Sequence, residues 1–189
     1  VTMHILMCND DGILADGLRQ LSTYLSQYYR VTVVAPATEQ SAKSHALTTE
    51  IPLKLDAYNG EDENPRLYAL TGTPSDCMKF GLSYLLSDDM PDLVISGINH
   101  GFNLGSDVLY SGTVSAAMES CFYGIPGLAL SVERYSPERG DEMHPFIHEL
   151  IEKIYVKGNF DGLLNVNFPL RGVCDWDHFK MVSQGLQTY

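Results

Sequence analysis

The stretch that decides the fold is His4-Ile5-Leu6-Met7-Cys8, an apolar run that ends at the polar turn Asn9-Asp10-Asp11-Gly12. A helical pattern follows over residues 18–28, where apolar side chains recur at spacings of three and four. The run Val31-Thr32-Val33-Val34-Ala35 then has the β-branched composition of a strand and stops at Pro36. A strand, a helix and a strand in this order form the βαβ unit of a parallel sheet.

The rest of the chain continues this alternation. Further strands are predicted at residues 92–96, 127–132 and 164–168, and further helices at 74–86, 113–123 and 143–157. Two alternating pieces, 47–55 and 67–70, predict a hairpin, whereas the Gly/Asn/Ser-rich stretch 97–112 predicts a long loop. We therefore expect one α/β domain over residues 1–189, with a mostly parallel sheet and helices on both faces.

Composition and charge exclude several classes of protein. The chain of 189 residues is 44% hydrophobic and carries 12 basic against 24 acidic residues, a net charge of −12. Such a surface repels nucleic-acid polymers, which bind through Lys and Arg. No apolar run approaches the ~18 residues of a membrane span, and no signal peptide is recognisable. Because the cysteines are scattered, we interpret them as reduced core thiols of a cytoplasmic protein: Cys8, Cys77, Cys121 and Cys174.

Polar clusters follow the predicted strands at their carboxyl ends, where open parallel sheets bind ligands. Asp10 and Asp11 follow the first strand, Ser41 follows the second, and Asn99 follows the strand that ends at Ser96. Two carboxylates, a hydroxyl and an amide oxygen form a donor set for a hard cation such as Mg²⁺, Mn²⁺ or Ca²⁺ rather than Zn²⁺. The alternative is that Asn9–Gly12 is only a turn, since Asp-Gly is common in turns.

The loop after residue 96 is the most unusual stretch of the chain. Gly97, Gly101 and Gly105 lie among asparagines, which suits close approach of the backbone to a ligand or, alternatively, a flexible surface loop. Ser111-Gly112-Thr113 then begins a helix whose free N–H groups suit a phosphate, although Ser111 or Thr113 could serve only as an N-cap.

Histidines offer further candidates. His45 and His100 lie in the loops of the predicted site and could contact phosphate or a proton, although a solvated loop histidine is the slightly favoured interpretation for each. His144 and His148 are four positions apart on a helix that looks exposed, but no third zinc ligand lies at a suitable spacing.

Taken together, these stretches resemble the survival protein SurE family of 5′-nucleotidases. The pieces that carry the resemblance occur in the order of the family across residues 5–168: Ile5 to Gly12, Val33-Val34-Ala35-Pro36 with Ser41, Gly72-Thr73-Pro74-Ser75-Asp76-Cys77, Ser96 to Asn99 with Gly101 and Asn103-Leu104-Gly105, Tyr110 to Thr113, and Leu164-Asn165-Val166-Asn167. Each piece alone is weak, but the ordered set is highly specific.

The resemblance implies a Rossmann-like fold and one divalent cation per subunit, Mg²⁺ or Mn²⁺, held by Asp10, Asp11, Ser41 and Asn99. It also implies phosphate contacts from Asn103, Ser111, Gly112 and Thr113. Members of the family hydrolyse nucleoside 5′-monophosphates, often 3′-monophosphates, and in some cases short polyphosphate. They form homodimers or homotetramers through an extended C-terminal arm.

Two departures from the family pattern stand out. The Ser41 loop reads Thr38-Glu39-Gln40-Ser41-Ala42, where the family usually has an Arg near the start and a Gly after the Ser. The sequence also stops at Tyr189, where family members usually continue for several dozen residues. From this we expect that the oligomerisation arm is missing or incomplete.

The mechanism we expect is hydrolysis by a metal-activated water, with Asp10, Asp11 and Asn103 as the catalytic residues. Asn103 and the 111–113 segment would hold the developing phosphoryl charge, and Asp10 or Asp11 could accept the proton of the water. Two alternatives remain open. Asp10 could form an aspartyl-phosphate, although the position two residues on is Gly12 rather than an acid. The chain could instead be a nucleotide-binding module without turnover.

Overall fold

The computed structural model describes residues 2–41 and 43–186, and in these ranges seven strands form one sheet in the order β3-β4-β2-β1-β5-β6-β7. All neighbouring strands are parallel except β3 and β4, which form an antiparallel pair. The strands are β1 (His4–Cys8), β2 (Arg30–Pro36), β3 (Leu55–Ala57), β4 (Arg66–Leu70), β5 (Leu93–His100), β6 (Gly127–Val132) and β7 (Leu163–Phe168).

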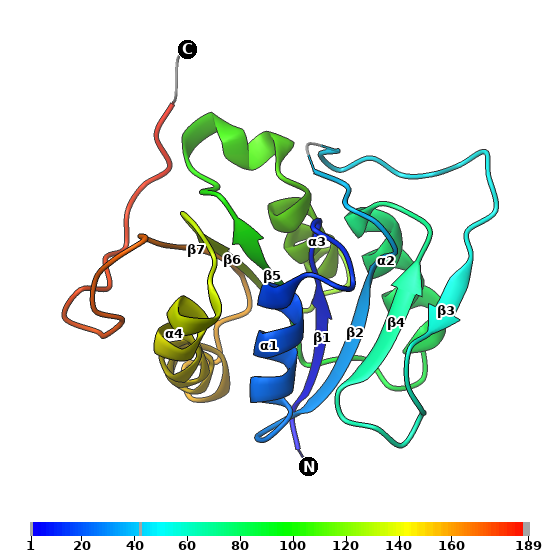
Figure 1. Ribbon diagram of the computed structural model, residues 1–189, viewed down its shortest axis with the longest axis horizontal. Helices are drawn as coiled ribbons and strands as arrows, with labels where there is room; N and C mark the ends of the chain where they lie inside the picture. Colours follow the sequence, from blue (N-terminus) through cyan, green and yellow to red (C-terminus); the bar gives the residue numbers. More distant parts are fainter. Residues whose placement is uncertain (1, 42, 187–189) are drawn as a thin grey trace.

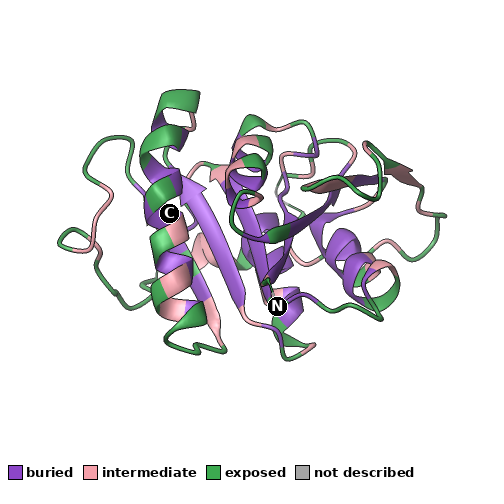
Figure 2. Cartoon of the chain, turned by 90° about the horizontal axis from the view of Figure 1, so that it is seen from below, coloured by how far each residue is buried: buried purple, intermediate pink, exposed green. Residues whose placement is uncertain are grey.

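Helices cover both faces of the sheet, as the sequence predicts (Figure 1). The main helices are α1 (Asp16–Leu25), α2 (Pro74–Phe80), α3 (Gly112–Cys121) and α4 (Pro137–Leu150). Helices α1 and α4 lie on one face, and α2 and α3 lie on the other. The central strands are buried between these two layers (Figure 2), so their apolar side chains form two cores separated by the sheet.

Three predicted elements differ from the structure. Strand β5 continues past Ser96 to His100. A register shift between Ser96 and Asn99 allows the strand to stay paired with β6 beyond Gly97. The hairpin exists as β3 and β4, but residues 47–54 are not strand. Helix α4 begins at Pro137 rather than at residue 143, since Ser136 caps it by accepting a hydrogen bond from the Arg139 N–H.

Two helices end in wider π-helical turns. Helix α2 continues over Gly81–Leu85, and α4 continues over Ile151–Val156, so both predicted helical segments end within a residue or two of the expected positions. The predicted loop before α3 also contains a 3₁₀ helix over Gly105–Tyr110.

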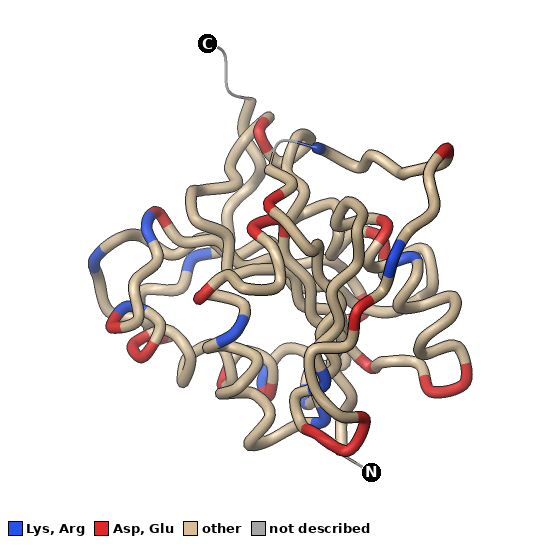
Figure 3. The backbone as a smooth tube through the Cα atoms, turned by 45° about the vertical axis from the view of Figure 1, so that its right-hand side comes forward, with Lys and Arg blue, Asp and Glu red and all other residues tan. Residues whose placement is uncertain are grey.

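Charge and polarity follow the expectations from composition. Acidic positions are spread over the whole molecule, and the few basic positions remain scattered among them (Figure 3). In the described part of the chain, none of the helices is both long enough and apolar enough to cross a bilayer. All four cysteines are unpaired, but only Cys8 and Cys77 are core thiols as expected; Cys121 is exposed and Cys174 is half-buried.

The segment after β7 packs against α4 without regular structure. The Arg139 guanidinium donates to the carbonyl oxygens of Pro169 and Gly172, and the Trp176 ring packs against Phe146. The departure from the family pattern at Ala42, and the last three positions up to Tyr189, lie outside the described residues.

Candidate functional site

The order of the strands fixes where a ligand can bind. The chain passes from β1 to β2 on one side of the sheet and later returns to β5 on the other side of β1. At such a switch point the connections leave in opposite directions, and a crevice opens beyond the carboxyl ends of the two strands. Asp10 and Asp11 lie just after the end of β1, and Asn99 is the next-to-last residue of β5. Ser41 follows the neighbouring strand β2.

The Asn9–Gly12 segment is a closed turn as well as part of the site. Asn9 is fully buried; its Oδ1 accepts from the Gly12 N–H at 3.1 Å, and its Nδ2 donates to the Gly12 carbonyl oxygen at 3.0 Å. Gly12 has φ of +100°, a conformation that side chains with a Cβ rarely adopt. The turn interpretation is therefore confirmed, and the turn fixes the direction of Asp10 and Asp11; the cation site stays a prediction.

The two carboxyl groups lie in surroundings that disfavour their negative charge. Asp10 is 5% exposed, and burial raises its pKa, partly offset by the hydrogen bond from Thr113. Burial, followed by the neighbouring charge of Asp10, raises the pKa of Asp11 to about 6, although the His100 main chain opposes that rise. A bound cation would reverse both effects, because it stabilises the ionised forms.

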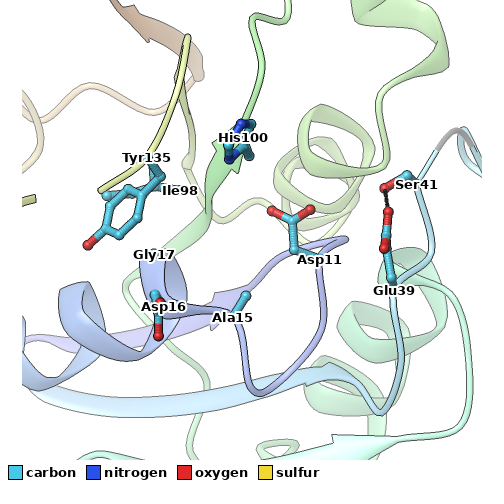
Figure 4. A pocket seen from close by; sticks show the side chains of 9 residues that line it. All are labelled: Asp11, Ala15, Asp16, Gly17, Glu39, Ser41, Ile98, His100 and Tyr135. Carbon is cyan, nitrogen blue, oxygen red and sulfur yellow. Dashed lines mark hydrogen bonds between the residues drawn. The ribbon is translucent and has the colours of Figure 1, made fainter. Parts of the chain in front are cut away.

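A cavity of about 440 Å³ opens beside these residues (Figure 4). At one end it is lined by Asp11, Glu39, Ser41 and His100, and at the other by Asp16 and Tyr135. The Ser41 hydroxyl donates to Glu39 Oε1 at 2.8 Å. Neither Asp10 nor Asn99 lines this cavity; the Asn99 Nδ2 donates to the Gly101 carbonyl oxygen at 2.8 Å.

The donor set fits a hard cation. Among the residues that the structure describes, no group of three or more His, Cys, Asp or Glu side chains is arranged for a metal ion. A cation at this edge would therefore use hydroxyl and amide oxygens together with the two carboxylates, which is the chemistry of Mg²⁺ and Mn²⁺ sites.

The N-terminus of α3 lies directly against Asp10. The Ser111 hydroxyl accepts from the Val114 N–H at 3.1 Å, so the predicted N-cap is confirmed. The Thr113 hydroxyl donates to Asp10 Oδ1 at 2.6 Å. A Cβ added at Gly112 would lie 3.0 Å from the Asp10 Cβ, so glycine permits this close approach of helix and carboxylate.

Asn103 is buried, with 6% of its surface exposed. Its Nδ2 donates to Ser131 Oγ at 2.7 Å, and its main-chain N–H donates to Asn167 Oδ1 at 2.8 Å. The side chain is thus fixed at the carboxyl end of β6, rather than loose in a surface loop.

The histidines have separate surroundings. His45 Nε2 lies 2.6 Å from Glu119 Oε2, so this ring has an acidic partner rather than solvent alone. His100 lines the cavity. The helix around His144 is not exposed as expected: His144 is buried against α1, and its Nε2 has no hydrogen-bond partner among the described residues.

Two cavity residues were missed from the sequence, whereas Glu39 belongs to the polar cluster expected after the second strand. Tyr135 follows β6 at its carboxyl end, so the rule that located Asp10 also applies to it. Asp16 carries no comparable signal, because an acid in the first turn of a helix is common for reasons of helix stability alone.

A mostly parallel sheet with two neighbouring carboxyl groups at its switch point, one buried and one half-buried, beside a helix N-terminus defines the class of Rossmann-like proteins. Comparison with known proteins gives the particular family. Residues 5–189 match the family described as Survival protein SurE, and the chain belongs to the SurE family.

Relatives and a solved structure agree with this assignment. A protein named 5′-nucleotidase SurE from Thermoanaerobacter sp. is 49% identical over 88% of this chain and 66% of its own length. One with the same name from Thermosipho melanesiensis is 43% identical over 99% of this chain and 73% of its own. The crystal structure of the SurE protein from Aquifex aeolicus superposes with a TM-score of 0.81 at 36% identity, covering 98% of this chain and 74% of that one. The chain spans about two thirds of the length of the first of these relatives.

Proposed function

We propose that this chain is a divalent-cation-dependent phosphomonoesterase that releases phosphate from nucleoside 5′-monophosphates. The observation that carries the proposal is the contact between the buried carboxylate Asp10 and the N-terminus of α3, made through Thr113. A cation held by Asp10 would lie beside an anion bound at this helix N-terminus. The name 5′-nucleotidase, borne by a relative that is 49% identical, supports the same reaction. Nucleoside 3′-monophosphates and short polyphosphate are further candidate substrates.

Asp10, Asp11, Ser41 and Asn99 would hold one Mg²⁺ or Mn²⁺ per subunit. Their oxygen atoms suit such an ion. Burial and the charge of Asp10 raise the pKa of Asp11 to about 6, and a bound cation would favour its ionised form. When bound, the ion supplies Lewis-acid stabilisation of phosphoryl charge and an acidified water.

The residues of the chain would bind and orient the phosphoryl group. The first N–H groups of α3, at Gly112 and Thr113, have no partner within the helix and suit phosphoryl oxygens. The Ser111 hydroxyl and the Asn103 amide would add further donors, and charge that develops in the transition state would be held by the same groups. Asp10 or Asp11 would accept the proton of the attacking water.

Partners and location follow from the same features. The substrate would be a small nucleotide and not a nucleic-acid polymer, because a protein of net charge −12 with scattered basic residues offers no tract for a phosphate backbone. We also propose a homodimer or homotetramer, as the resemblance implies, and a cytoplasmic location in keeping with four unpaired cysteines.

The test is phosphate release from AMP, GMP and CMP with and without Mn²⁺ or Mg²⁺. Asp10→Asn should abolish cation-dependent release, because it removes the charge on which the cation site depends. Asp88→Asn is the matched control, since Asp88 is exposed in the turn that precedes β5, away from the carboxyl ends of the strands. Release by the wild type that is insensitive to EDTA would contradict the proposed dependence on a cation.

The two rivals predict different results. A covalent aspartyl-phosphate at Asp10 would appear as a phosphoenzyme on acid quenching, whereas direct attack by water leaves the protein unlabelled. A binding module would bind AMP in the presence of EDTA and release no phosphate under any condition.

A further inference from the structure

The main chain of Asn103 is held by two side chains from the edge strand β7. The Asn103 N–H donates to Asn167 Oδ1 at 2.8 Å, and the Asn103 carbonyl oxygen accepts from Asn165 Nδ2 at 2.9 Å and from Asn167 Nδ2 at 3.1 Å. Both main-chain polar groups of Asn103 are thereby satisfied by residues more than 60 positions away. Such bridging fixes a loop that has no strand or helix of its own.

The Asn103 side chain is fixed as well. One of its two amide hydrogens is donated to the hydroxyl of Ser131, which is fully buried in β6. With the main chain held by β7 and the carboxamide held by β6, Asn103 has little rotational freedom. The rest of its amide is therefore presented in one orientation.

The placement of the two asparagines on β7 makes this arrangement possible. Asn165 and Asn167 are two positions apart, so their side chains project from the same face of the strand. Leu164, Val166 and Phe168 project from the other face into the core. In the parallel register Asn167 lies opposite Ser131, which brings all the partners of Asn103 to one corner of the sheet.

We propose that Asn165 and Asn167 are positioning residues, which hold Asn103 in the orientation in which its carboxamide binds a phosphoryl group. The inference rests on the proposed function, because it assigns to these two residues the preorganisation of that phosphate site. A preorganised donor loses less conformational freedom on binding than a mobile one, so the arrangement strengthens phosphate binding without touching phosphate.

The chain offers a matched control for a purely structural role. In the hairpin, Asn59 makes the same kind of bridge, since its Oδ1 accepts from the Leu67 N–H at 2.8 Å and its Nδ2 donates to the Pro65 carbonyl oxygen at 2.7 Å. Asn59→Ala should therefore lower stability about as much as Asn167→Ala, through the loss of two comparable hydrogen bonds. It should leave the phosphate site intact.

The experiment measures the affinity of the protein for inorganic phosphate by calorimetry in the presence of Mn²⁺, the Mn²⁺ affinity itself, and the melting temperature. For Asn167→Ala we expect phosphate affinity to fall about ten-fold or more, with Mn²⁺ affinity unchanged. Asn167→Asp keeps the acceptor for the Asn103 N–H but removes one donor to the Asn103 carbonyl oxygen, as Asn165→Ala does. We therefore expect these two variants to lose phosphate affinity in the same way. Asn59→Ala should bind phosphate like the wild type.

Equal phosphate affinity in wild type, Asn167→Ala and Asn59→Ala would overturn the inference, whatever the melting temperatures. So would a parallel loss of phosphate and Mn²⁺ affinity, which would indicate a general collapse of the sheet edge. Turnover of AMP is recorded separately: its absence in the wild type would refute the proposed function, while the comparison of phosphate affinities would still decide the role of the asparagines.

Discussion

Thr113 donates a hydrogen bond of 2.6 Å to Asp10, and this contact joins the first turn of α3 to the loop after β1, across 103 positions of sequence. Both side chains are buried, so the bond is shielded from water. Burial raises the pKa of Asp10, whereas this hydrogen bond lowers it, because a donor to the carboxylate favours the ionised form. The contact therefore couples the predicted phosphate site to the predicted cation site.

Replacement of Thr113 by valine tests this coupling. The variant keeps the shape of the side chain and removes the donor, so the pKa of Asp10 should rise further and Mn²⁺ affinity should fall, by roughly ten-fold for one charge-assisted hydrogen bond. Isothermal titration with Mn²⁺ at pH 7 measures the change. Thr23→Val, at an exposed position of α1, is the control and should bind Mn²⁺ like the wild type. An unchanged Mn²⁺ affinity in Thr113→Val would mean that this bond does not support the site.

Gly112 allows the close approach of α3 to Asp10. An alanine Cβ there would lie 3.0 Å from the Asp10 Cβ and 3.1 Å from its Oδ2, tighter than ordinary van der Waals contact. We expect Gly112→Ala to lower phosphate release from AMP by about ten-fold to a hundred-fold, since displacement of catalytic groups by less than 1 Å is costly. At Gly60 the nearest atom to an added Cβ is 3.8 Å away, so Gly60→Ala is the control. Wild-type rates in Gly112→Ala would show that Asp10 can shift without consequence.

Much of the fold is predictable from the sequence, because β1, β2 and β6 are apolar runs bounded by turn residues, β7 alternates apolar residues with asparagines, and α3 begins at a clear N-cap. The continuation of β5 to His100 was not predictable. Gly97 and Asn99 have low strand propensity, and only pairing with β6 across the register shift keeps them in the sheet. The start of α4 at Pro137 was missed although Ser136-Pro137 is a good N-terminal signal. Gly140 and Pro145 interrupt the helical pattern that follows.

The candidate site was only partly predictable, because some of its contacts depend on how neighbouring strands pair. The rule of strand ends located Asp10, Asp11, Ser41 and Asn99, because it needs only the order of strands along the chain. It could not reveal that Asn165 and Asn167 hold Asn103, since that contact depends on the register of β6 with β7. Nor could it show that the Asp11 carboxyl lies in a partly buried cavity, which depends on the packing of the loops.

Ser111 has two predicted roles, capping of α3 and binding of phosphate. Comparison with Ser136, which caps α4, separates them. The Ser111 hydroxyl caps α3, so Ser111→Ala should lower the free energy of unfolding by about 1 kcal/mol, the usual cost of a lost cap. Ser136 caps α4 in the same way, by accepting from the Arg139 N–H, so Ser136→Ala should cost a similar amount. Only Ser111→Ala should also lower kcat/KM for AMP. Chemical denaturation and steady-state kinetics on both variants measure the two effects. Equal kinetics would leave Ser111 with the capping role alone.

His144 should make the stability of the protein depend on pH. Burial lowers its pKa below the ordinary 6.5, and the nearby Asp141 carboxylate opposes this only in part. In the unfolded chain the imidazole takes up a proton near its ordinary pKa, whereas in the folded protein it resists protonation. The stabilising effect of the neutral ring is therefore fully present above about pH 6.5, and it is lost as the pH falls toward and through the lowered pKa.

Urea denaturation of wild type and His144→Gln at pH 5 and pH 7 measures this dependence. The variant should be less stable than the wild type at pH 7, because it loses the packing of the ring against Tyr24, whose centroid is 5.4 Å away. Between pH 7 and pH 5, however, it should lose less stability than the wild type. His148→Gln, one turn later on α4 and half-buried against Tyr28, is the control for the loss of a histidine ring from this helix. If His144→Gln and the wild type lose equal stability on acidification, another group must account for the acid sensitivity. His4 would then be the next to test, since burial lowers its pKa too.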